Sequence, residues 1–179
     1  DGISGTVTSS ATGAVVNVND VPTGSVTISG TATEDQVLTA SNTLADEDVL
    51  GSISYQWQRG GADIAGATAS TYNLVQADVG TAITVAASYT DGEGTAETVA
   101  SSATGAVVNV SHAATGAVSI SGTVAEDQVL TASNTLADAD GLGSISYQWQ
   151  RGGADIAGAN TSTYTLVQAD VGTAITVAA

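Results

Sequence analysis

The chain has 179 residues and a formal net charge of −16, because it contains 18 Asp and Glu residues and only 2 Lys or Arg residues. So acidic a chain is repelled by nucleic-acid phosphates and by anionic membrane surfaces, which excludes nucleic acid as a partner. No apolar run reaches the roughly 18 residues of a membrane span, so we expect no membrane insertion, and the absence of Cys excludes disulfides.

Short runs of alternating apolar and polar residues recur along the chain and predict β-strands separated by turns. One run has Ile53, Tyr55 and Trp57 on one face and polar residues on the other, as a sandwich strand requires. The last expected strand is long and bent at Gly105. No stretch has convincing helical spacing, so we predict an all-β fold. In the first half of the chain the expected strands lie near residues 25–29, 36–41, 53–58, 70–74, 82–89 and 99–110.

The same pattern then repeats. Residues 24–87 recur as residues 116–179, 92 positions further on without a gap, and 9 of the 64 positions differ. Residues 10–18 (SATGAVVNV) also recur, as residues 102–110. A repeat of this size predicts tandem modules that are each one folding unit.

The repeat register predicts three segments. Residues 1–18 match the last strand of a preceding module, residues 19–110 a complete module, and residues 111–179 a second module without its last strand. Two explanations stay open at this point. The chain is a fragment of a longer array, or the leading segment of one copy completes the truncated module of another by strand donation.

Two resemblances extend this interpretation. A Trp on the third strand and the Asp78-Val79-Gly80 sequence before the sixth resemble immunoglobulin-type sandwiches without their cysteine pair. The strings LADEDVLGSISYQWQRGGADIAGA and LVQADVGTAITV, with the linker NVNDVPTG, resemble the immunoglobulin-like or cadherin-like repeats of giant RTX-type bacterial surface adhesins. This resemblance implies tandem immunoglobulin-like β-sandwich modules, secreted to the bacterial cell surface and dependent on calcium.

Acidic residues are concentrated in the loops that this fold predicts. Calcium binds six to eight oxygen atoms, which loops of this kind supply. The resemblance implies calcium where two modules meet, at the end of the sandwich that carries the linker. The alternative is that these residues form turns and keep the surface soluble; Asp78 and Asp170 are predicted to be structural corner residues. The metal ligands that we expect are Asp20 with Asp46 and Asp48 at one junction, and Glu34 and Asp35 facing Asp138 and Asp140 at the other.

The two linkers differ. Where the first has Asn19-Asp20-Val21-Pro22, the second has Ser111-His112-Ala113-Ala114, with neither the carboxylate nor the proline. Since His is a poor calcium ligand, we expect weaker calcium binding and greater flexibility at the second linker.

Catalysis is not expected. His112 is the only His, it lies in a linker, and Tyr55 and Trp57 are predicted to face the core rather than a substrate groove. We predict a structural extender segment of an extracellular adhesin or surface fibre, with neighbouring repeats as its partners. Two alternatives remain: a filament subunit that assembles by strand donation, and a module that binds carbohydrate or protein. The binding module would require exposed aromatic residues that differ between the copies, and the nine differences contain none.

Overall fold

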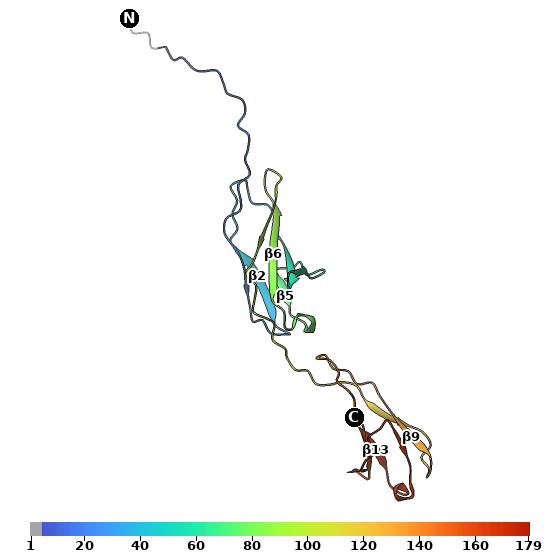
Figure 1. Cartoon of the computed structure of the whole chain (residues 1–179). Coiled ribbons are helices and arrows are strands. Elements are labelled where there is room, and N and C mark those ends of the chain that lie inside the picture. Colours follow the sequence, from blue (N-terminus) through green and yellow to red (C-terminus); the bar gives the residue numbers. More distant parts are fainter. Residues whose placement is uncertain (1–4) are drawn as a thin grey trace. The chain divides into compact units, whose positions relative to one another are not determined.

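The computed structural model describes residues 5–179, which form two compact units (Figure 1). The first reaches to Asn109 and the second runs from Val110 to Ala179. Both consist of antiparallel strands, and one turn of 3-10 helix in each is the only helical structure in the described residues. The predicted all-β fold is therefore confirmed. No helix in residues 5–179 has the length and apolar character to cross a membrane.

The first module is a sandwich of two sheets. One has the order β1-β2-β5, and the other has the order β4-β3-β6-β7. The long strands β3 and β6 lie next to each other, as the third and sixth strands do in immunoglobulin-like sandwiches. A 3-10 turn at Gln76–Asp78 leads from β5 into β6. The strands are β1 (Val26–Ser29), β2 (Val37–Asn42), β3 (Ser54–Arg59), β4 (Ala62–Asp63), β5 (Thr71–Asn73), β6 (Ile83–Thr90) and β7 (Ala96–Ala100).

Trp57 lies at the centre of this core and is fully buried, as its place in the alternating pattern of β3 predicts. Its indole N–H donates to the carbonyl oxygen of Ala69 at 2.8 Å, and its ring lies 5.7 Å from the ring of Tyr72. The alternating residues Ile83 and Val85 of β6 are also fully buried. The apolar residues that alternate with polar ones in the sequence therefore form the buried face of each long strand.

The second module repeats this arrangement around Trp149, with sheets in the order β12-β9-β8 and β11-β10-β13. Its core is thinner, because Ile175 and Val177 are only partly buried whereas their counterparts Ile83 and Val85 are fully buried. The strands are β8 (Val118–Ser121), β9 (Val129–Asn134), β10 (Gln148–Arg151), β11 (Ala154–Asp155), β12 (Thr163–Thr165) and β13 (Ile175–Ala178), with a 3-10 turn at Gln168–Asp170.

The end of the first module differs from the single bent strand predicted over residues 99–110. Strand β7 begins earlier, at Ala96, and ends at Ala100. Residues 106–108, which we name the closing segment, then form isolated bridges with Ala82, Val79 and Thr33 in turn. The bridge of Ala106 is antiparallel, whereas those of Val107 and Val108 are parallel. The closing segment therefore forms no continuous ladder with one strand. The closing segment covers the trailing end of the sandwich, where the chain leaves it.

Candidate functional site

At the leading end of the first module, where the chain enters, the structure brings together the three residues expected at one junction. The two oxygens of Asp46 accept hydrogen bonds from the Tyr89 hydroxyl at 2.5 Å and from the backbone N–H of Asp48 at 2.9 Å. The Asp48 carboxylate accepts the backbone N–H of Asp20 at 2.7 Å. Burial, and then the hydrogen bond to Asp46, raise the pKa of Tyr89 well above its ordinary value. Asp20 thus joins the cluster through its backbone.

Asp91, in the loop between β6 and β7, lies beside this cluster. One of its oxygens accepts the backbone N–H groups of Glu93 and Thr95 at 2.9 and 2.7 Å. The other oxygen is buried and has no hydrogen-bond donor among the described residues. The next residue, Gly92, donates its N–H to the carbonyl oxygen of Asp48 at 2.8 Å, which ties the two loops together. Asp91 is not among the ligands predicted from the sequence.

The leading end of the second module has the same backbone arrangement despite its different linker. The Asp140 carboxylate accepts the backbone N–H of His112 at 2.7 Å, just as Asp48 accepts that of Asp20. Asp138 in turn accepts the N–H of Asp140 at 2.9 Å. The His112 ring lies 3.7 Å from Asp140. The exchange of Asp for His therefore preserves the backbone contact and changes only the side chain beside it.

The two remaining predicted ligands lie at the trailing end of the first module. Glu34 is buried, and its backbone N–H donates to the carbonyl oxygen of Val108 in the closing segment at 2.9 Å. Asp35 has a φ of 64°, and its counterpart Asp127 has a φ of 62°. Asp tolerates this left-handed conformation better than most residues, which accounts for Asp at this turn.

Hydrogen bonds link predicted ligands within a module, but in the part of the chain that the structure describes their carboxylates do not gather three at a time. Among residues 5–179, no three carboxylate or imidazole groups of one module bring their ligand atoms within 4.8 Å of one another. The calcium ligand set therefore stays a prediction.

In each module a partly exposed Arg pairs with a buried Asp near the 3-10 turn. The Arg59 guanidinium donates to fully buried Asp78 at 2.6 Å, while the Tyr72 hydroxyl and the Val75 N–H donate to the other carboxylate oxygen at 3.0 and 2.8 Å. The hydrogen bond to Asp78 raises the pKa of Arg59 above its ordinary value. Since both carboxylate oxygens are occupied by protein donors, Asp78 has the structural role that its corner position predicts.

The second module has the same arrangement, with 2.5 Å between Arg151 and Asp170. Burial on its own would raise the pKa of Asp170. The hydrogen bonds from the Val167 N–H, Arg151 and Tyr164 outweigh burial and lower that pKa.

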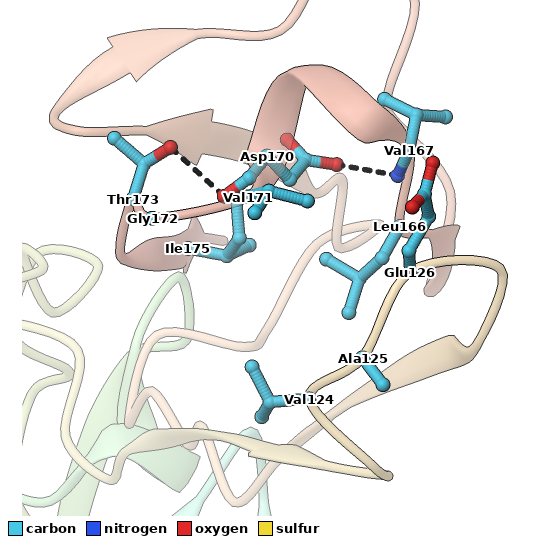
Figure 2. A pocket seen from close by; sticks show the side chains of 10 residues that line it. All are labelled: Val124, Ala125, Glu126, Leu166, Val167, Asp170, Val171, Gly172, Thr173 and Ile175. Carbon is cyan, nitrogen blue, oxygen red and sulfur yellow. Dashed lines mark hydrogen bonds between the residues drawn. The ribbon is translucent and has the colours of Figure 1, made fainter.

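A groove opens at the trailing end of the second module, with a volume of about 400 Å³. Figure 2 shows Val124 and Ala125 on one side of it and Val171 and Ile175 on the other. Two of these apolar side chains are largely exposed, Val124 at 79% and Val171 at 61%. The other lining residues are Glu126, Leu166, Val167, Asp170, Gly172 and Thr173.

No family model matches the sequence, and no curated protein matches it. Among solved structures, the chain is similar to the three N-terminal domains of the highly immunogenic outer capsid protein (Hoc) of bacteriophage RB49. The identity is 19% and the TM-score is 0.34, over 87% of this chain and 53% of that one, so this chain spans about half its length. The immunoglobulin-like assignment rests on the strand order and the core of each module.

Proposed function

We propose that the chain is a run of non-catalytic extender modules from an extracellular protein of the bacterial cell surface, which holds a binding domain away from the cell. The observation that carries the proposal is where the two copies differ. None of the nine differing positions is buried in the first module, and none involves an aromatic residue. A part that serves only as a spacer needs an intact core and no distinctive surface.

Length measurements test this proposal. Chains with two, three and four tandem copies of residues 19–110 are expected to gain a constant increment of about 35–45 Å in maximum dimension per copy, because the 8 residues of β6 rise about 3.3 Å each and the loops and linker add to that length. Small-angle X-ray scattering measures this increment. A maximum dimension that stays constant as copies are added would contradict the extender role. Saturable binding of a glycan or a host protein to the 179-residue chain would favour the binding-module alternative.

We further propose that calcium binds at the leading end of the first module. The buried Asp91 oxygen without a donor supports this, because a buried polar atom normally has a partner. The carboxylate of Asp48 belongs to the loop that the Gly92 N–H bonds, next to Asp91, whereas both oxygens of Asp46 already accept protein donors. Oxygen atoms of this kind are the ligands that calcium prefers. Bound calcium would balance the negative charge of these carboxylates. It would also stiffen the linker, because the backbone N–H of Asp20 in that linker donates to Asp48.

Calorimetry tests the calcium proposal. Calcium at about ten times its Kd is expected to stabilise the first module by about 1.4 kcal/mol relative to EDTA, which raises its Tm by several degrees. Asp91→Asn should abolish this increment. Glu93→Gln is the matched control, because Glu93 is an exposed residue of the same loop, and it should retain the increment. Equal melting temperatures in calcium and in EDTA would contradict the proposal.

A further inference from the structure

We infer that Val49 lowers the calcium affinity of the first module's leading end, because the loop conformation that binds calcium strains the backbone at Val49. This inference rests on the calcium site proposed above. Val49 has a φ of 75°, in the left-handed region that branched residues rarely adopt. Its counterpart in the second module is Gly141, which has a φ of 98° and adopts that region without steric cost. The first module therefore carries a backbone strain that the second does not.

Backbone hydrogen bonds hold Val49 in the strained conformation. Its N–H donates to the carbonyl oxygen of Asp46 at 3.3 Å, and the Gly92 N–H donates to the carbonyl oxygens of Asp48 and Val49 at 2.8 and 3.0 Å. The two loops pack closely, since a Cβ at position 92 would lie 3.0 Å from the Cβ of Val49. Rotation of Val49 to a negative φ would turn these two carbonyl groups relative to each other, so the Gly92 N–H could not keep both. We call the conformation with both bonds the closed loop.

The second module makes the same turn without the strain. The Gly141 N–H donates to the carbonyl oxygen of Asp138 at 3.2 Å, and the Asp140 N–H donates to the Asp138 carboxylate at 2.9 Å. The turn therefore follows from the Asp residues that both modules have. Val49 is not needed to form the turn and adds only its strain.

Without a cation the closed loop has a second cost. One oxygen of Asp91 is buried and has no hydrogen-bond donor among the described residues, and Asp48 is buried as well. A buried carboxylate oxygen without a partner is unfavourable. Calcium removes this cost but not the strain at Val49. The two costs together favour an open loop when calcium is absent, so part of the binding free energy of calcium is used to close the loop.

Calorimetric titration of calcium into the 179-residue chain tests the inference. Val49→Gly is expected to lower the Kd about five- to tenfold, because the closed loop is then more populated before calcium binds. This change corresponds to about 1.0–1.4 kcal/mol, within the range that the left-handed conformation costs a residue other than Gly. If both chains bind calcium with the same Kd, the inference is wrong and the calcium site stands. If neither chain binds calcium, both are wrong.

Two matched variants separate backbone strain from other effects of substitution. Val49→Ala removes two methyl groups but keeps a Cβ in the left-handed conformation, so its Kd should stay within about threefold of that of the unsubstituted chain. Glu47→Ala makes the other change that distinguishes this loop from its copy, where Ala139 stands, and removes an exposed charge. Its Kd should also stay within about threefold. A gain in affinity from Val49→Ala as large as that from Val49→Gly would show that strain is not the cause.

Hydrogen exchange of the Gly92 amide reports the closed loop directly, because this N–H donates to Asp48 and Val49. In EDTA the amide should exchange at least about twofold more slowly in the Val49→Gly chain than in the unsubstituted chain, since the closed loop is more populated. In saturating calcium it should be protected in both chains. Equal exchange rates of the two chains in EDTA would mean that Val49 does not open the loop, which would overturn the inference.

Discussion

Replacing Trp57 by Ala is expected to destabilise the first module by about 3–5 kcal/mol, a large part of the stability of a small domain. The side chain is fully buried, donates to Ala69 and packs against Tyr72, so its removal leaves a cavity and an unpaired carbonyl oxygen. Urea denaturation followed by circular dichroism measures the effect.

The repeat supplies the controls. Trp149 is the only Trp that remains in the Trp57→Ala chain, so its fluorescence follows the second module and should report an unchanged midpoint. Trp149→Ala should destabilise the second module in the same way, since its indole N–H donates to Thr161 at 2.9 Å. A free energy of unfolding of the first module within about 1 kcal/mol of its value in the unsubstituted chain would show that Trp57 is not the centre of its core.

Asp78→Ala is expected to cost the first module about 3 kcal/mol. The substitution leaves the Tyr72 hydroxyl and the Val75 N–H without their acceptor. Arg59 stays 31% exposed and so remains partly hydrated, which holds the cost below that of a fully buried pair. In a Trp149→Phe background, Trp57 fluorescence reports the first module alone.

Asp63→Ala is the matched control for this experiment. Asp63 is an exposed carboxylate that accepts a hydrogen bond from the Gln58 side chain, at 2.8 Å on the neighbouring strand. Its removal should change stability by no more than about 0.5 kcal/mol. Equal shifts for the two variants would mean that the buried pair adds nothing beyond an ordinary surface contact.

The sequence was sufficient for the features that depend on local pattern. Alternation predicted that Trp57 faces the core, and the Asp78-Val79-Gly80 corner predicted a structural carboxylate. Features that depend on distant partners could not be predicted. Arg59 and Asp78 are 19 residues apart, and nothing in the spacing shows that they meet. The path of the closing segment was missed because its residues contact three different parts of the module in succession.

The acidic loops show the same limit. Asp and Glu in turns suggest exposed charge, yet Glu34, Asp48 and Asp91 are buried. Their burial depends on the backbone and side chains that the fold places around them. The second linker shows that a change of side chain, from Asp20 to His112, does not imply a change of backbone contact.

The pairing of Arg59 with Asp78 and of Arg151 with Asp170 has a consequence at larger scale. These two Arg residues are the chain's only Lys or Arg side chains, and each is already bonded to a carboxylate of its own module. Nearly all remaining formal charge is therefore negative. Parallel fibres built from such modules would act as a polyelectrolyte brush, whose mutual repulsion reaches over the Debye length of about 8 Å at physiological salt and about 30 Å at 0.01 M. Dilute surroundings would spread the fibres apart, and salt would let them crowd together.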